Sequence, residues 1–275
     1  MDQLLAPGLY IVATPIGNLG DITLRAVETL RGVSAIACED TRVTGKLLHH
    51  LGIKQRLVRY DDHASEETRE YLLRLAGEGP LALVSDAGTP LISDPGFKLV
   101  RMARDRGIAV TSLPGASAAV MAITLSGIPS DRFLFAGFLP SKDKARREVL
   151  VELAEVPATL VFYETSPRLT DALEAIDDVL SGREVAVARE LTKKFEECRS
   201  GSARELIEHY TANPPKGEIA LVVGPPLEKA PEEHDVDALL LAALGDAKAS
   251  QAAAQVAKAT GLDRKALYAR AMELK

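Results

Sequence analysis

The residues best suited to chemistry lie in short segments that each follow an apolar run. These segments are rich in glycine, proline, serine, threonine and acidic residues, and they are residues 14–21, 39–42, 61–63, 85–96 and 114–117. If the apolar runs are parallel strands, the segments meet at one edge of a sheet, where open α/β sheets bind ligands. Few of their residues are basic, so we expect an uncharged or cationic ligand there rather than a polyphosphate.

Residues 85–96 are the most informative of these segments. They read Ser-Asp-Ala-Gly-Thr-Pro-Leu-Ile-Ser-Asp-Pro-Gly and follow the apolar run 81–84. Gly88 lets backbone amides approach a ligand because it has no Cβ, and Pro90 and Pro95 restrict the segment, so that less entropy is lost on binding. A strand-to-helix connection needs only about two to six residues. We therefore favour a ligand-binding role over the alternative, a rigid connection without a ligand.

The sequence lacks the signatures of several other sites. No Gly-x-Gly-x-x-Gly follows the first apolar run, and no Gly-x-x-x-x-Gly-Lys-[Ser/Thr] occurs, which argues against a Rossmann dinucleotide site and a P-loop. No Gly-x-Ser-x-Gly elbow is present either. Cys38 and Cys198 match no metal or redox spacing, and the histidines are scattered. We therefore predict no metal site and two reduced thiols.

Strand-like and helix-like patterns alternate along most of the chain, which predicts α/β architecture with a mostly parallel sheet. The expected strands are 8–13, 33–38, 56–60, 81–84 and 109–113, followed by 132–138, 159–163, 184–189, 195–200 and 218–223. Of the second set, 184–189 and 195–200 could pair with each other. We predict an N-terminal α/β domain (1–127), a second α/β domain (128–226), a linker (227–237) and a helical module (238–275).

The predicted helical module has a charge opposite to that of the whole chain. Six basic and three acidic residues between Asp246 and Lys275 give it a net charge of about +3, against −6 for the chain. Gly261 and Asp263 suit the end of one helix and the start of the next, as in a helix-turn-helix unit. Two uses remain open: contact with nucleic acid through Lys258, Arg264 and Lys265, or packing and dimerisation.

Composition sets broader limits. With 47% hydrophobic residues the chain can bury a normal core, and it has no apolar run of about 18 residues, so we expect no membrane span. No basic stretch followed by an apolar one opens the sequence, and we expect a cytoplasmic protein without a secretion signal. The negative net charge argues against coating of nucleic acid by the whole surface, but it allows a local basic patch.

Several motifs resemble the ribosomal RNA small-subunit methyltransferase I family. They occur in the family's order over nearly the whole chain, and they are residues 14–23, 39–42, 85–90, 93–96, 113–117, 135–140, 162–169 and 189–197. The resemblance implies a class III methyltransferase of the tetrapyrrole-methylase-like superfamily. S-adenosylmethionine would bind in a cleft between two α/β domains. A homodimer would methylate the ribose 2′-hydroxyl of a cytidine in the decoding region of 16S rRNA, within the 30S subunit.

The resemblance also implies which residues contact the cofactor. They are Pro15, Ile16, Gly17, Gly88, Thr89, Pro90, Ile92, Ser117, Ala118, Tyr163, Ala188, Arg189, Val223 and Gly224. Two other functions remain open for this chain. It could be a methylase of the same superfamily that acts on a tetrapyrrole or on a protein side chain, or it could bind RNA without catalysis. If the protein did not bind S-adenosylmethionine, only the last of these would remain.

Transfer to a ribose hydroxyl calls for an aligned donor and a nearby base. Glu39 and Asp40 are the candidate bases, and Arg42 could orient a carboxylate or hold a phosphate; alternatively the three form a structural ion-pair network. Basic residues that could contact rRNA phosphates, or simply be solvated, are Lys142, Lys144, Arg146, Arg147 and Lys193. The few aromatic residues that could stack on bases are Tyr60, Phe138 and Tyr163, of which Phe138 and Tyr163 could instead be core residues.

Overall fold

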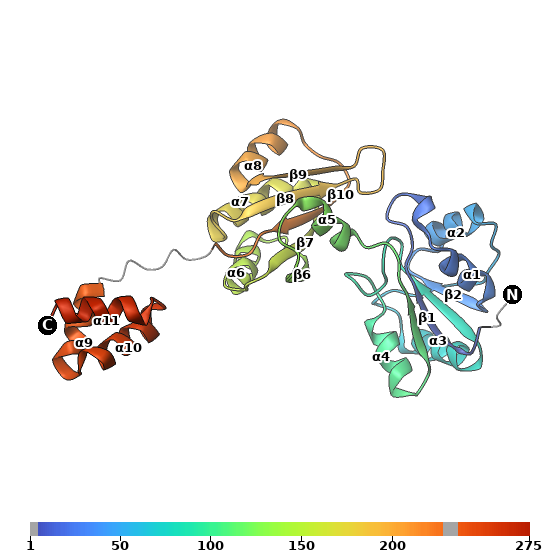
Figure 1. Cartoon of the computed structure of the whole chain (residues 1–275). Coiled ribbons are helices and arrows are strands. Elements are labelled where there is room, and N and C mark those ends of the chain that lie inside the picture. The colour runs from blue at the N-terminus through green and yellow to red at the C-terminus, as the bar shows by residue number, and fades with distance from the viewer. Residues whose placement is uncertain (1–4, 228–235) are drawn as a thin grey trace. The chain divides into compact units, whose positions relative to one another are not determined.

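The computed structural model describes residues 5–227 and 236–275. The chain divides into two compact units, Met1–Pro226 and Leu227–Lys275 (Figure 1). The first unit contains two five-stranded sheets with helices, so the predicted α/β class is confirmed. Most of the predicted linker, residues 228–235, lies outside the described residues, and its last two residues, Val236 and Asp237, begin a helix.

The first sheet is entirely parallel, with the strand order β3-β2-β4-β1-β5. Its strands are β1 (Gly8–Val12), β2 (Ala35–Cys38), β3 (Leu57–Arg59), β4 (Pro80–Val84) and β5 (Val110–Leu113). β1 and β4 are neighbours, but the chain leaves them towards opposite faces of the sheet. This divergence opens a crevice at their carboxyl ends, which is the usual ligand position in such sheets.

Helices cover both faces of the first sheet. One face buries Ala26 and Leu30 of α1 (Leu24–Gly32) and Leu48 of α2 (Thr41–His50). The other buries apolar side chains of α3 (Glu66–Glu78) and α4 (Phe97–Asp105). The short helix η1 (Leu19–Asp21) precedes α1. α2 and α4 therefore lie on opposite sides of the sheet.

The second sheet is mixed, with the order β6-β7-β10-β8-β9. Its strands are β6 (Phe133–Phe138), β7 (Thr159–Thr165), β8 (Glu184–Arg189), β9 (Glu197–Ser202) and β10 (Glu218–Val223). Among its neighbouring pairs only β6 and β7 are parallel. β10 is antiparallel to both β7 and β8, and β8 and β9 pair with each other as predicted, in antiparallel register. The amino end of β10 therefore lies beside the carboxyl ends of β7 and β8.

Helices also cover the second sheet on both faces. α6 (Asp143–Leu153), α7 (Leu169–Val179) and α8 (Ala203–Ala212) share one core with it, and the short helix η2 (Ser166–Arg168) leads into α7. α5 (Ala118–Ser126) packs on the other face through Ala122. This helix, which we had placed in the N-terminal domain, lies on the second sheet because its small residues fit against Ala186, Ala188 and Ala220.

The second unit consists of α9 (Val236–Asp246), α10 (Ala249–Thr260) and α11 (Arg264–Glu273). Leu240, Val256 and Leu267 are buried in its own core. Gly261 ends α10 in the left-handed conformation, and the Asp263 carboxylate caps α11 by accepting backbone N–H groups, as the sequence predicted. Among the described residues no helix is both long and apolar enough to cross a membrane.

Gly96, which ends the 85–96 segment, gives a test of how tightly that segment is held. Its φ is 141°, and an added Cβ would lie 2.9 Å from side-chain atoms of Leu83 and Leu91. Gly96→Ala should lower the free energy of unfolding by roughly 1–3 kcal/mol, measured by urea denaturation. Gly107, with a φ of 70° and open space around it, is the control. Equal losses for Gly96→Ala and Gly107→Ala would show that these contacts are unimportant.

Candidate active site

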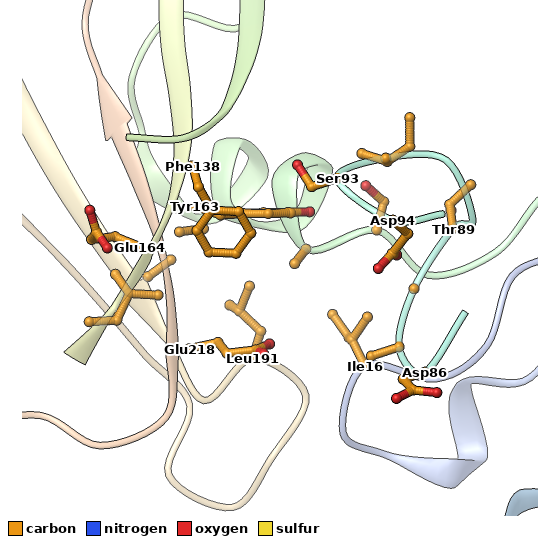
Figure 2. A pocket seen from close by; sticks show the side chains of 18 of the residues that line it. Ile16, Asp86, Thr89, Ser93, Asp94, Phe138, Tyr163, Glu164, Leu191 and Glu218 are labelled. Carbon is orange, nitrogen blue, oxygen red and sulfur yellow. The ribbon is translucent and has the colours of Figure 1, made fainter. Parts of the chain in front are cut away.

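A cavity of about 320 Å³ lies where loops of the first sheet face the second sheet (Figure 2). From the first sheet come residues after β1, β2 and β4, together with the start of α5. From the second come the carboxyl ends of β6, β7 and β8, the loop after β8, and the amino end of β10. Its size is within the range of small-molecule sites, which begins at roughly 300 Å³.

The 85–96 segment forms one wall and is tied to its neighbours by hydrogen bonds. The Thr14 N–H donates to the Gly88 carbonyl at 2.9 Å, and the Gly88 N–H donates back to the Thr14 carbonyl at 3.0 Å. The Thr89 hydroxyl donates to the Ala116 carbonyl at 3.0 Å. These bonds fix the wall across the crevice between β1 and β4, so the site is largely formed before any ligand binds.

Strained backbone is concentrated around this cavity. The non-glycine residues with positive φ in the described part of the chain are Leu91 (75°), Ser93 (61°), Glu190 (50°) and Thr192 (66°). The first two belong to the 85–96 wall, and the other two to the loop after β8 that borders the opposite side. Such conformations persist where surrounding contacts impose them, and they cluster at functional sites.

Four carboxylates at the cavity have no ion-pair partner among the described residues: Glu39, Asp86, Asp94 and Glu218. Burial raises the pKa of Asp94 to about 6, helped by repulsion from the other three and opposed by a hydrogen bond with Ser85. Burial also raises the pKa of Glu39. The cavity is therefore strongly electronegative, which favours a cationic ligand.

Two other carboxylates at the cavity are neutralised. Glu164 is fully buried and forms an ion pair with Arg168 at 3.0 Å, and Figure 2 shows its carboxylate turned away from Asp94. Glu190 forms an ion pair with Lys193 at 2.8 Å. These pairs leave the excess negative charge on Glu39, Asp86, Asp94 and Glu218.

An aromatic surface faces the 85–96 wall. The Tyr163 ring packs edge-on against Phe135 and Phe138, with ring centroids 4.8 and 5.6 Å away. The Tyr163 hydroxyl accepts a hydrogen bond from the backbone N–H of Ala119 at 3.2 Å. In Figure 2 Tyr163 and Phe138 lie across the cavity from Thr89 and Asp94. The cavity thus offers an apolar surface opposite its acidic wall.

The structure brings together only part of the predicted cofactor set. The residues of that set that line the cavity are Ile16, Gly88, Thr89, Ile92, Ser117, Ala118, Tyr163 and Ala188. Pro15, Gly17, Pro90 and Arg189 adjoin lining residues in the sequence but are not lining residues themselves, and the Arg189 guanidinium is held by Glu197.

Val223 and Gly224 lie away from the cavity, which corrects their predicted place. The resemblance implied that the carboxyl end of the last strand completes the site. Because β10 is antiparallel to β7 and β8, its amino end lines the cavity instead, through Glu218, Ile219 and Ala220.

Of the predicted catalytic residues, Glu39 lines the cavity and Asp40 and Arg42 do not. The Asp40 carboxylate caps α2 by accepting from the Arg42 backbone N–H at 2.8 Å, and it also binds the Arg42 guanidinium, with a shortest contact of 2.6 Å. These bonds hold the pKa of Asp40 far below its ordinary value. A carboxylate held in this way is a weak proton acceptor, so the structural alternative fits Asp40 and Arg42 better.

Two of the basic residues predicted to bind phosphate near α6 form ion pairs within the fold instead. Arg146 is buried, with its guanidinium 3.5 Å from Asp143 and 3.8 Å from Asp171, which corrects its predicted exposure to RNA. Arg147 is paired with Asp143 and Asp178. Lys142 and Lys144 are exposed, as are Lys258, Arg264 and Lys265 in the second unit, whereas Lys193 lines the cavity.

Several lining residues were missed by the sequence analysis. Asp86, Ser93 and Asp94 belong to the segment that we singled out, and their place in a turn after a buried strand was a usable signal. Glu190, Leu191 and Glu218 gave no such signal, because their position depends on strand direction and on a loop conformation with positive φ.

Sequence comparison identifies two segments. Residues 8–207 match the family described as Tetrapyrrole (Corrin/Porphyrin) Methylases, and residues 230–275 match the RsmI C-terminal HTH domain. The chain is similar to a protein of Erythrobacter litoralis named Ribosomal RNA small subunit methyltransferase I, at 66% identity over 271 residues, covering 98% of this chain and 96% of the relative. An Escherichia coli O157:H7 protein of the same name is 49% identical over 272 residues, covering 96% and 94%.

Solved structures show the same fold at low sequence identity. Uroporphyrin-III-C-methyltransferase from Thermus thermophilus superposes with a TM-score of 0.57 at 22% identity, covering 79% of this chain and 94% of that one. Diphthine synthase superposes with a TM-score of 0.58 at 16% identity, covering 78% and 89%. These matches bear on the fold alone.

The raised pKa of Asp94 predicts a measurable destabilisation. The folded protein keeps this carboxyl protonated up to about pH 6, whereas its ordinary pKa is 3.8. The free energy of unfolding should therefore fall as the pH rises from 3.8 to 6, with the whole penalty present above pH 6. Asp94→Asn removes it, and should stabilise the ligand-free protein at pH 7.5 by at most roughly 3 kcal/mol.

Thermal unfolding of both proteins at pH 4.5 and pH 7.5 measures this effect. We expect the melting temperature of Asp94→Asn to exceed that of the wild type at pH 7.5, and the gap to shrink at pH 4.5. A variant less stable than the wild type at pH 7.5 would mean that the Asp94 carboxylate is favourably bound in the fold.

Proposed function

Because the chain belongs to the ribosomal RNA small subunit methyltransferase I family, within the tetrapyrrole methylases, we propose that it transfers a methyl group from S-adenosylmethionine to ribosomal RNA. The proposed target is the ribose 2′-hydroxyl of a cytidine in the decoding region of 16S rRNA. The enzyme would act in the cytoplasm as a homodimer, on rRNA within the 30S subunit. One observation carries the proposal: an acidic cavity of small-molecule size built from the family's motifs.

The cavity residues fit the proposed cofactor in charge and in shape. When bound, S-adenosylmethionine supplies a methyl group on a positively charged sulfur, and it also carries an ammonium group. Glu39, Asp86, Asp94 and Glu218 provide unneutralised negative charge for such a ligand. Gly88 brings backbone close to the cavity without a Cβ, and Tyr163 offers an aromatic surface for a flat ring.

The same carboxylates also favour turnover. They hold a cation more tightly than the neutral thioether that remains after methyl transfer, so they bind the donor and favour release of the product. The positive φ values at Ser93 and Glu190 indicate that surrounding contacts hold both walls in place. The main contribution of the protein is then alignment of donor and acceptor rather than covalent chemistry.

Glu39 is the proposed proton acceptor for the ribose hydroxyl. It lines the cavity, has no ion-pair partner among the described residues, and has a raised pKa because of burial and the nearby Asp86. Those properties suit a general base better than the tightly paired Asp40. Asp94, which is more deeply buried, would contribute charge for binding the cation.

A methyl-transfer assay tests the proposal as a whole. Purified protein is incubated with labelled S-adenosylmethionine and either 30S subunits or free 16S rRNA, and the modified nucleotide is mapped after nuclease digestion. The proposal expects label on a cytidine ribose in the decoding region. Label on a base, or transfer to neither RNA, would contradict it, and transfer to a tetrapyrrole alone would favour a small-molecule methylase.

Thr89→Arg should block cofactor binding without unfolding the protein. Thr89 is half-buried at the cavity, so an arginine there would fill the space and add a positive charge. Calorimetric titration with S-adenosylmethionine should show at least about a 100-fold loss of affinity. Thr111→Arg, at an exposed position of β5 outside the cavity, is the control. Unchanged affinity in Thr89→Arg would show that the site is misplaced.

Removal of the second unit should separate cofactor binding from RNA engagement. The unit has its own core, and Lys258, Arg264 and Lys265 are exposed on it. A chain ending at Leu227 should bind S-adenosylmethionine as the full chain does and should methylate 30S subunits at least about tenfold more slowly at low substrate concentration. Equal rates would make the unit irrelevant to the substrate.

A further inference from the structure

The solvent-facing side of α2 carries a line of basic and small residues. Arg42, Lys46 and His49 are exposed and are spaced three or four residues apart, so they lie on one side of the helix. Gly45 lies between Arg42 and Lys46 on the same side. The opposite side is buried through Leu48 and its neighbours. We call Arg42, Gly45, Lys46 and His49 the α2 face.

The α2 face starts at the edge of the cavity. Glu39 lines the cavity, and Asp40, the next residue, caps α2. The backbone N–H of Asp40 donates to the carboxylate of Asp86, another lining residue, at 3.2 Å. From this point the helix extends for about 15 Å, at 1.5 Å per residue. A chain that places one unit in the cavity could therefore continue along this helix.

Part of the charge of the α2 face is available to a ligand, because Lys46 is unpaired among the described residues whereas Arg42 is paired with Asp40. Asp40 binds the Arg42 guanidinium through Nε and Nη2, at 3.0 and 2.6 Å, and thereby fixes the exposed side chain with Nη1 free to donate. Lys46 and His49 have no ion-pair partner among the described residues. Arg147 on α6, by contrast, is paired with two aspartates.

Gly45 leaves open space beside the basic residues of the α2 face. It lies within a regular helix, where glycine is less favourable than alanine. Apart from the chain neighbours of Gly45 and the backbone of its own helix, no atom of the described residues lies within 4 Å of the place that its Cβ would occupy. Packing therefore gives no reason for the missing side chain. Its effect is a notch beside Arg42 and His49 that allows another backbone to approach closely.

We propose that the α2 face binds the phosphodiester backbone of the RNA strand whose target nucleotide enters the cavity. The inference rests on the proposed function and adds to it the part of the protein that positions the RNA. Lys46 supplies charge for a phosphate group, Arg42 offers its Nη1 as a hydrogen-bond donor, and the notch at Gly45 lets the strand lie against the helix. Contacts of this kind set register and orientation, while the cavity selects the reacting atom.

Gly45→Ala tests the notch directly, because it should affect folding and binding in opposite directions. The open space accepts a methyl group, so the melting temperature should rise. The added methyl should hinder the RNA backbone and weaken binding to 30S subunits about fivefold, as measured by filter binding. Gly77→Ala is the control: Gly77 is an exposed glycine near the end of α3, also with no atom within 4 Å, and its replacement should leave RNA affinity unchanged.

Lys46→Ala tests the charge. It should weaken RNA binding about fivefold at low salt, and the slope of log affinity against log salt concentration should fall by about 1. Lys98→Ala removes an exposed lysine from α4, on the other side of the first sheet, and should change neither quantity. Both proteins should keep the wild-type affinity for S-adenosylmethionine.

The outcomes separate this inference from the proposed function. If the wild type methylates 30S subunits but Gly45→Ala and Lys46→Ala bind RNA as it does, the α2 face is wrong and the function stands. If the wild type binds RNA without methylating it, the function fails, while weaker binding by the two variants would still support the α2 face. If the wild type binds neither 30S subunits nor 16S rRNA, both are overturned.

Discussion

Burial of the Asp94 carboxylate beside three other carboxylates, unpaired among the described residues, is the constraint on which this site depends. Burial raises the pKa of Asp94, and the nearby Glu39, Asp86 and Glu218 raise it further. Such an arrangement makes the ligand-free protein less stable than it could be. A fold retains it when a ligand of opposite charge offsets the repulsion, and a sulfonium donor has that charge.

Two topological features place those carboxylates together. In the first sheet the chain leaves β1 and β4 towards opposite faces, and the Thr14–Gly88 hydrogen bonds span the resulting crevice. In the second sheet the antiparallel β10 brings Glu218 to the carboxyl ends of β7 and β8. The α2 face adjoins the site because the chain that supplies Glu39 after β2 continues directly into α2.

The sequence predicted the parts of the site that depend on local chemistry. The 85–96 segment was identified from its turn residues after a buried strand, and Gly88, Thr89, Ser117 and Ala118 do line the cavity. Val223, which the resemblance placed at the site, lies at the other end of β10, because that strand is antiparallel to its neighbours. Arg146 was misplaced because only tertiary packing decides whether a basic side chain is buried. Asp40 was predicted as a candidate base because its pairing with Arg42 depends on side-chain geometry, which the sequence does not show.

The central claim is that the methyl donor lies in this cavity, against its acidic wall. A crystal structure of the protein with bound S-adenosylhomocysteine measures this most directly. The account predicts density for the ligand between Thr89 on one side and Tyr163 on the other, next to Ala118 and Ala188. Density at another place, with this cavity still empty or closed, would contradict it.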